Sequence, residues 1–303
     1  VLFNGTVLAW GRNDFKQLGI FSTDQPIQKP SEVESLRSKS VLDIVTNEHT
    51  FVLCQDSEVL AFGLNKSGQL GLGHTSKVTR PEVPEWSKQG MRMSITSGAF
   101  HAILLTKMPC ISASSGLSRS VWSWGYNKHG ELGLGWKSLE INKMAIGSKV
   151  PVPIAFLKGL DVSIFECGWY HSFAVINRRD IYGDGTKIFG APVFAQDSEQ
   201  AIFAFGYNRQ GQLGLGHTVD QEKLTFLDAR MWGMKFSVKR IFCAGLSTYF
   251  LCTDNSVWSM GSNGKGQLGC GKIGGKSKSP MLVEKLSFKG VVHMSCGYDH
   301  CFA

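Results

Sequence analysis

The chain has 303 residues, of which 43% are hydrophobic, and its 32 Lys and Arg against 24 Asp and Glu give a formal net charge of +8. This apolar content is enough for a large core, and no run approaches the 18 or more apolar residues of a membrane-spanning helix. The composition therefore favours a globular protein and excludes a helical membrane protein. The positive charge is compatible with an acidic partner such as nucleic acid, an acidic protein surface or anionic lipid.

A signature of nine residues, Gly-x-Asn-x-x-Gly-Gln-Leu-Gly, occurs five times along the chain with small variations. An alternation of β-branched, large apolar and small residues precedes each copy, as in Val59-Leu60-Ala61-Phe62. This pattern predicts a strand that is buried on both faces and runs into a tight turn. The copies begin at Gly11, Gly63, Gly125, Gly206 and Gly261, and the first has Lys16 where the others have their second Gly.

A second signature follows each copy of the first: an apolar strand, a small residue that is often Gly, and then His. Another apolar strand comes next and leads to the following copy. Each period therefore predicts about four short strands and no helix, which is typical of one blade of a β-propeller. The five instances are 46–49, 98–101, 168–171, 245–248 and 297–300, with Thr248 taken to replace the His of the fourth.

The repeated residues have structural roles that follow from their chemistry. Gly permits positive φ, the short Asn side chain bonds its own turn, and the Leu fills the space between sheets. The recurring His is expected at a hydrogen-bonding core position rather than at a metal site, because the copies fall in different blades. All of these residues are therefore interpreted as blade scaffold.

The two signatures together resemble the regulator of chromosome condensation repeat family. The second is fullest in Cys167-Gly168-Trp169-Tyr170-His171 and Cys296-Gly297-Tyr298-Asp299-His300, and the match covers nearly the whole chain. The resemblance implies a β-propeller, usually of seven blades. The family includes the exchange factor for the GTPase Ran, a plant ultraviolet-B photoreceptor, and scaffolding domains of ubiquitin ligases, kinases and ciliary proteins.

The expected fold is all-β, a single propeller domain over residues 1–303 built of four-stranded blades, with five repeats visible. The expected repeat units are 1–49, 50–101, 102–171, 172–248 and 249–303. Two explanations of the count stay open. The chain is a fragment of a longer array, which the absent initiator Met favours, or it is a closed five-blade ring whose first and last strands share one blade. Joining Ala303 to Val1 separates His300 from Gly11 by fourteen residues, as His49 is separated from Gly63.

Catalytic patterns are not found in the sequence. Gly275-Lys276-Ser277 matches only the end of a phosphate-binding loop, and neither a Gly-x-Ser-x-Gly elbow nor a paired-carboxylate arrangement occurs. We therefore expect no enzyme, no catalytic residue, no cofactor and no metal. The eight cysteines include no Cys-x-x-Cys pair, so we expect reduced thiols and an intracellular protein, cytoplasmic or nuclear.

Function is sought where the repeats differ. The connection from Asn177 to Gln200 is long and carries arginines and aromatic residues, which favours a protein-binding surface. Trp169 is a further candidate. A lysine-rich segment from Lys265 to Lys289 is a second candidate surface. The residues singled out are Arg178, Arg179, Tyr182, Phe189, Phe194 and Trp169 for partner binding, and Lys272, Lys276 and Lys278 for the basic edge.

Three functions are compatible with these observations. The first is a non-catalytic protein-interaction scaffold, with another protein as its partner. The alternative is a guanine-nucleotide exchange factor for a Ran-like small GTPase, in which the Asn177 to Gln200 connection would be the wedge. The third is a light sensor, since Gly168-Trp169-Tyr170-His171 resembles the photoreceptor's Gly-Trp-Arg-His. Nucleic acid or chromatin stays open as a partner without support from the sequence.

Overall fold

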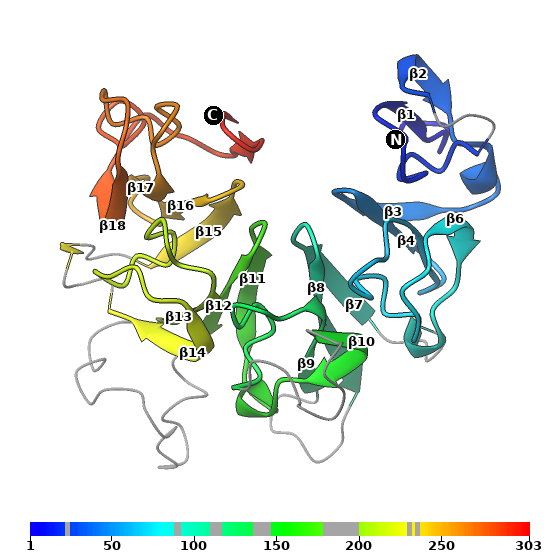
Figure 1. The fold of residues 1–303 in the computed structure, drawn as a ribbon, viewed down its shortest axis with the longest axis horizontal. Helices are drawn as coiled ribbons and strands as arrows, with labels where there is room; N and C mark the ends of the chain where they lie inside the picture. The colour runs from blue at the N-terminus through cyan, green and yellow to red at the C-terminus, as the bar shows by residue number, and fades with distance from the viewer. Residues whose placement is uncertain are drawn as a thin grey trace. The chain divides into compact units, whose positions relative to one another are not determined.

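The computed structural model describes residues 1–21, 25–87, 92–109, 117–135, 147–177, 200–228, 232–233 and 237–303 (Figure 1). The chain divides into two compact units. The first consists of Val1–Tyr126 with Ser138–Ile154, and the second of Asn127–Lys137 with Ala155–Ala303.

The first unit contains three antiparallel sheets. A two-stranded sheet pairs β1 (Leu8–Gly11) with β2 (Ile27–Glu32). Two four-stranded sheets follow in the orders β3-β4-β5-β6 and β7-β8-β9-β10. Their strands are β3 (Val41–Thr46), β4 (His49–Cys54), β5 (Val59–Gly63), β6 (Val78–Glu82), β7 (Arg92–Ser97), β8 (His101–Pro109), β9 (Leu117–Tyr126) and β10 (Gly147–Pro153), with 3-10 turns η1 (Glu34–Leu36) and η2 (Glu85–Ser87).

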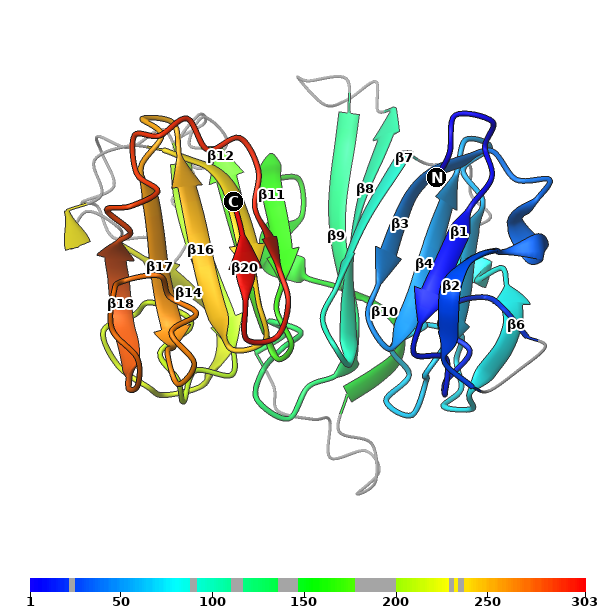
Figure 2. The same ribbon diagram turned by 90° about the horizontal axis from the view of Figure 1, so that it is seen from above.

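The second unit repeats this plan with two four-stranded sheets, β11-β12-β13-β14 and β15-β16-β17-β18, and a two-stranded sheet β19-β20. Figure 2 shows β16, β17 and β18 side by side. The strands are β11 (Val162–Cys167), β12 (His171–Asn177), β13 (Gln200–Gly206), β14 (Gln221–Leu227), β15 (Val238–Cys243), β16 (Ser247–Cys252), β17 (Val257–Ser262), β18 (Lys276–Leu282), β19 (Ser295–Cys296) and β20 (Cys301–Phe302), with a 3-10 turn η3 (Ala155–Leu157).

The all-β prediction is confirmed, since short 3-10 turns are the only helical elements in the described part of the chain. In the four-stranded sheets the four residues before the signature Gly are mostly buried, as the sequence pattern predicts, whereas β1, which has the same pattern, is partly exposed and carries Trp10 at 59% exposure. Every residue of β5 is buried, and so are six of the seven residues of β13. The Leu of the signature is buried in each of its last four copies: Leu70, Leu132, Leu213 and Leu268 are at most 1% exposed.

The outer strand of each sheet is polar and partly exposed, and it commonly contains Pro. Pro has no N–H to donate, so it suits a strand whose far side has no neighbour in the sheet. It also discourages pairing with another chain's edge. The residues concerned are Pro30 in β2, Pro81 in β6, Pro151 and Pro153 in β10, and Pro280 in β18.

Strand register places the two signatures opposite each other. His49 faces Gly63, His101 faces Gly125, and His171 faces Gly206. In the fourth instance Ser247, not Thr248, faces Gly261, so the sequence alignment is wrong there by one residue. The turn explains the shift. The N–H of Ala244 donates to the O of Ser247 just as that of Gly168 donates to the O of His171, so Ala244 takes the place of the signature Gly.

Lys16 keeps the backbone conformation of the Gly that it replaces. Its φ is +64°, whereas the Gly residues at the same position, such as Gly68 and Gly211, have φ of +73° and +80°. A non-Gly residue in this region costs roughly 1 kcal/mol. The first turn therefore forms with the same shape as the others despite the missing Gly.

Candidate functional site

The signature turns are closed by the side chain of their own Asn. The N–H of Leu70 donates to Asn65 Oδ1 at 3.0 Å, and Asn65 Nδ2 donates to the O of His74 at 3.0 Å. These bonds satisfy the turn locally and confirm the role predicted for the Asn. The equivalent backbone bond to the Asn side chain is made by Leu18, Leu132, Leu213 and Leu268.

The first Gly of the signature permits close approach of the opposite strand. Gly63 has φ of +107°, and a Cβ there would lie 2.8 Å from Cα of His49. His49 and His171 are fully buried, and burial lowers the pKa of each to about 3, so both rings are neutral at pH 7. His171 Nε2 lies 2.9 Å from Thr248 Oγ1, whereas neither ring nitrogen of His49 has a hydrogen-bond partner among the described residues. These residues belong to the core rather than to a site.

A hydrogen bond to one backbone carbonyl links successive repeats. The carbonyl belongs to the Gln position of the signature, and in the first four copies its donor comes from the next sheet. In the last copy the donor is Tyr249, from the same sheet. The pairs are Thr50 to Gln17 (2.6 Å), Trp124 to Gln69 (2.8 Å), Ser172 to Glu131 (3.3 Å), Thr248 to Gln212 (2.9 Å) and Tyr249 to Gln267 (2.6 Å).

Aromatic side chains gather at the variable positions beside the two signatures in the second unit. Tyr170 precedes His171 and Tyr207 follows Gly206. The backbone N–H of Tyr207 donates to the O of Tyr170 at 2.8 Å, and their ring centroids are 6.2 Å apart. Trp169 lies between Tyr170, at 6.3 Å, and Tyr298, at 4.2 Å. We call Trp169, Tyr170, Tyr207, Tyr298 and His129 the aromatic cluster.

His129 joins the aromatic cluster to charged groups. Its ring lies 4.9 Å from that of Tyr207, and its Nδ1 lies 2.9 Å from Asp220 Oδ2. Asp220 Oδ1 accepts the N–H of Asn208 at 2.9 Å, and Arg209 Nε lies 3.8 Å from Asp220 Oδ2. The N–H of Asn208 thus holds the carboxylate of Asp220 in place. That carboxylate in turn orients the His129 ring beside the tyrosines.

The aromatic cluster is accessible. Tyr298 is 44% exposed, and Trp169, Tyr170, Tyr207 and His129 are each partly exposed. Amphipathic rings of this kind, with polar atoms at their edges, are enriched at protein interfaces. The arrangement can bind another surface by stacking and hydrogen bonding. Sequence reasoning found Trp169 and missed the other four members, for which the available signal was their place next to the repeated Gly and His.

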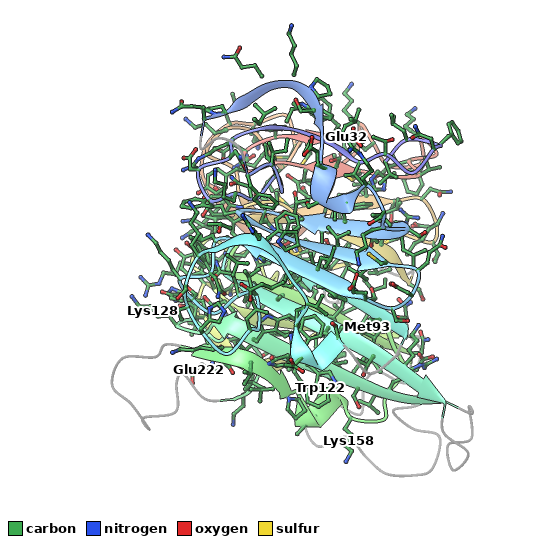
Figure 3. The ribbon with its side chains drawn as sticks, turned by 90° about the vertical axis from the view of Figure 1, so that its right-hand side faces the viewer. Glu32, Met93, Trp122, Lys128, Lys158 and Glu222 are labelled. Atoms are coloured by element: carbon green, nitrogen blue, oxygen red, sulfur yellow. The ribbon has the colours of Figure 1, made fainter. Side chains whose placement is uncertain are left out.

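The turn that carries His129 packs tightly on the neighbouring segment of its unit. A Cβ at Gly130 would lie 2.4 Å from the O of Gln221 and from Cα of Glu222. Figure 3 labels Lys128 in this turn and Glu222 on β14. The close approach requires Gly at this position, and it places the turn that carries His129 against the start of β14.

The three lysines of the predicted basic edge lie on and before the outer strand β18. Lys272, Lys276 and Lys278 are all exposed. Lys276 Nζ donates to the O of Arg209 at 2.8 Å, and Lys77 Nζ makes the equivalent bond to the O of Asp14 at 2.9 Å. Lys276 therefore links repeats, while Lys272 and Lys278 stay predicted binding residues.

The long connection predicted to bind a partner lies outside the described residues. Arg178, Arg179, Tyr182, Phe189 and Phe194 fall within 178–199. The strands on either side are described, and Asn177 pairs directly with Gln200. The connection therefore joins two adjacent strands of one sheet.

One group of three potential metal ligands occurs in the described part of the chain: Cys54, Asp56 and Glu58, at the β4–β5 turn. Lys39 Nζ hydrogen-bonds Glu58 Oε2, so the carboxylate of Glu58 is already paired with a cation. Asp56 Oδ1 accepts the N–H of Glu58 and closes the turn. Among the described residues, no helix is long and apolar enough to cross a membrane.

A family model, the regulator of chromosome condensation (RCC1) repeat, matches residues 4–53, 56–105, 120–175, 200–251 and 254–303. The chain belongs to the RCC1 repeat family. Each matched segment contains both signatures or their counterparts. The predicted propeller of four-stranded blades is therefore confirmed, and the blade scaffold described above is that of RCC1 repeats.

Curated relatives of this RCC1-repeat chain include large ligases and a receptor. It is 28% identical over 299 residues to the human E3 ubiquitin-protein ligase HERC2, covering 97% of this chain and 5% of the ligase. It is 24% identical over 320 residues to the ultraviolet-B receptor UVR8 of Arabidopsis thaliana, covering 94% of this chain and 67% of the receptor. The chain thus spans only a small part of the ligase.

Solved structures with the same fold include human WBSCR16, with a TM-score of 0.72 and 18% identity, over 98% of this chain and 67% of that one. They also include Prp20p from Saccharomyces cerevisiae, with a TM-score of 0.67 and 16% identity, over 98% of this chain and 64% of that one. Prp20p was reported with its binding properties to Gsp1p and histones. At these identities the likeness shows the RCC1-type fold alone.

Proposed function

We propose that this RCC1-repeat chain is a non-catalytic protein-interaction scaffold whose second unit binds a protein partner through the aromatic cluster. The observation that supports the proposal is the contiguity of five partly exposed rings, from Tyr298 through Trp169 and Tyr170 to Tyr207 and His129. Tyr and Trp at the centre of interfaces commonly contribute about 2 kcal/mol or more each.

The repeated residues support a scaffold rather than an enzyme. The signature Asn, Leu and Gly close turns and fill the core, and His49 and His171 are buried and neutral. Exposed residues lie at the variable positions, and in the second unit these include the rings of the aromatic cluster. A surface of this composition suits a protein with its own apolar and hydrogen-bonding groups.

Quantitative affinity capture from cell extract tests the proposal. The parent chain is compared with a Trp169→Ala, Tyr298→Ala double variant and with Trp10→Ala, since Trp10 is 59% exposed and lies in the first unit. Proteins retained by the parent and by Trp10→Ala should be lost from the double variant. Equal retention by all three chains, with thermal unfolding unchanged, would contradict a binding role for the aromatic cluster.

The exchange-factor alternative stays a prediction. It depends on the segment 177–200, of which 178–199 lie outside the described residues. Ran loaded with a fluorescent guanine nucleotide distinguishes the two functions. A scaffold leaves nucleotide release at its intrinsic rate, whereas an exchange factor accelerates it in proportion to the concentration of the chain.

A further inference from the structure

Two cysteines face each other across the hairpin of β19 and β20. Cys296 and Cys301 are direct partners in the strand register, and their Sγ atoms lie 2.7 Å apart. The N–H of Gly297 donates to the O of His300 at 2.8 Å, so the cysteines form the neighbouring non-hydrogen-bonded pair. Side chains approach most closely across such pairs. The hairpin therefore brings both thiols together on one face of the sheet.

The same pair of positions occurs in three other sheets without a second thiol. The pairs are Ser97 with Ala102, Cys167 with Ser172, and Cys243 with Thr248. Cys167 Sγ lies 3.8 Å from Ser172 Oγ. Backbone geometry is thus common to these repeats, and the thiol pair is a property of the side chains at Cys296 and Cys301.

Cys301 does not make the hydrogen bond between repeats that residues at its position make in other sheets. At the equivalent position, Ser172 and Thr248 donate to the carbonyl of Glu131 and Gln212. For Gln267 that donor is the hydroxyl of Tyr249, at 2.6 Å. The thiol of Cys301 is therefore not required for the link between repeats, and its chemistry is available for another purpose.

We propose that Cys296 and Cys301 form a reversible thiol–disulfide couple, with a low-molecular-weight disulfide such as glutathione disulfide as the oxidant. The thiolate of Cys301 attacks one sulfur of the oxidant, forming a mixed disulfide and releasing one thiolate. Cys296 loses its proton to solvent and attacks Sγ of Cys301, forming the protein disulfide and releasing the second thiolate. The protein loses two electrons and two protons, and the oxidant becomes two thiols. The couple is independent of the proposed binding function.

Exposure and charge support this order of events. Both cysteines are partly exposed, whereas Cys54, Cys167 and Cys252 are buried. The thiol of Cys296 can donate to the thiolate of Cys301, which lowers the pKa of Cys301. The same contact and burial raise the pKa of Cys296. Cys301 is thus the nucleophile towards the small oxidant, because the thiolate is the reactive form, and Cys296 is the resolving thiol.

Oxidation closes a covalent ring around residues 297–300. This hairpin carries Tyr298, whose ring lies 4.2 Å from Trp169, and Asp299, whose Oδ1 accepts Gln267 Nε2 at 3.3 Å. In the oxidised state the two strands that present Tyr298 cannot separate. Oxidation of the couple therefore restricts the motion of the hairpin that carries Tyr298.

The test is equilibration of the chain in glutathione buffers of increasing oxidation, followed by acid quenching, alkylation of free thiols and peptide mass spectrometry. The parent should convert to a Cys296–Cys301 disulfide in a single two-electron transition. Cys296→Ser and Cys301→Ala should each lose that bond, and Cys296→Ser should instead accumulate glutathione on Cys301. Cys243→Ser is the matched control, and its transition should equal that of the parent.

Three results would overturn the proposal. The first is a parent chain with both thiols free in fully oxidised glutathione. The second is stable glutathione adducts on both cysteines of the parent. The third is a disulfide that joins Cys243 rather than Cys301 to Cys296. Far-ultraviolet circular dichroism of each variant confirms that the strands persist, so that a loss of the bond reports on the thiols.

Discussion

His171 of one sheet and Thr248 of the next are joined by a hydrogen bond of 2.9 Å between Nε2 and Oγ1. The hydroxyl proton of Thr248 is used in its own bond to the O of Gln212, at 2.9 Å, so Nε2 must donate. Both residues are fully buried. A single hydroxyl thus bonds both Nε2 of the core His of one repeat and the carbonyl of that repeat's signature turn, and it joins two sheets of the second unit.

Thr248→Val should lower the free energy of unfolding by about 2 kcal/mol. Valine keeps the volume but leaves a buried donor and a buried acceptor without partners, which costs about 1–3 kcal/mol for such a group. Thr248→Ser keeps the hydroxyl and should lose much less. Urea unfolding followed by tryptophan fluorescence measures both. A larger loss for Thr248→Ser than for Thr248→Val would show that the methyl group, not the hydroxyl, stabilises this contact.

Trp124→Phe should lower the free energy of unfolding by about 1–3 kcal/mol, because the indole N–H is the donor to the O of Gln69 at 2.8 Å and both groups are buried. Trp10 occupies the same place in the first repeat and is 59% exposed. Trp10→Phe is therefore the matched control and should change the thermal midpoint little. Similar shifts for the two variants would contradict the link between repeats.

The repeated part of the fold could be predicted from the sequence, because its causes are local. Gly63 needs positive φ, Asn65 bonds its own turn, and Leu70 lies in the core, and these requirements recur with each copy. The position of Ser247 could not be read in the same way. It depends on which residue starts the turn, and Gly245 imitates the signature Gly while Ala244 takes its place.

The candidate site depends on contacts between segments far apart in the chain. Trp169 was visible as a variation within one repeat, but Tyr298 lies beside it only because the sheets of the second unit follow one another in space. The donor to the Gln69 carbonyl likewise comes from a strand position that holds Phe62 or Phe205 elsewhere. The sequence pattern of one repeat does not show which residue of another repeat makes such a contact.

Glu131→Gln should stabilise the chain at pH 8 and change it little at pH 4. Glu131 is fully buried where other copies have Gln69 and Gln212, and burial raises its pKa to about 8. Below its ordinary pKa of about 4.3 both the folded and unfolded states hold the proton. Between that value and about 8, the unfolded state ionises and the folded state does not. Stability therefore falls as pH rises through this window.

Glutamine should remove this pH dependence, because its Oε1 can accept the N–H of residue 129 as Gln69 Oε1 accepts that of Ser67 at 2.9 Å. Thermal midpoints of the parent and Glu131→Gln between pH 4 and pH 8 test the prediction. Curves that stay parallel across the window would show that Glu131 does not carry the shifted proton.

A deletion separates the aromatic cluster from the long connection as the place of partner binding. Asn177 pairs directly with Gln200, so residues 178–199 can be replaced by a two-residue Asn-Gly turn that suits an antiparallel pair. The replacement keeps the bond from the N–H of Val238 to Gln200 Oε1, at 2.9 Å, and should leave the sheet folded. A shorter loop also has a smaller entropic cost of closure, so the replacement should not destabilise the sheet.

If the aromatic cluster binds the partner, the shortened chain should capture the same proteins as the parent, and adding Trp169→Ala should abolish capture. If the arginines and aromatic residues of 178–199 bind it, capture should be lost on shortening alone, with thermal unfolding unchanged. The two surfaces predict opposite results for the shortened chain. Loss of capture on shortening alone would move the proposed site from Trp169 and its neighbours to the connection, because the shortened chain retains every ring of the aromatic cluster.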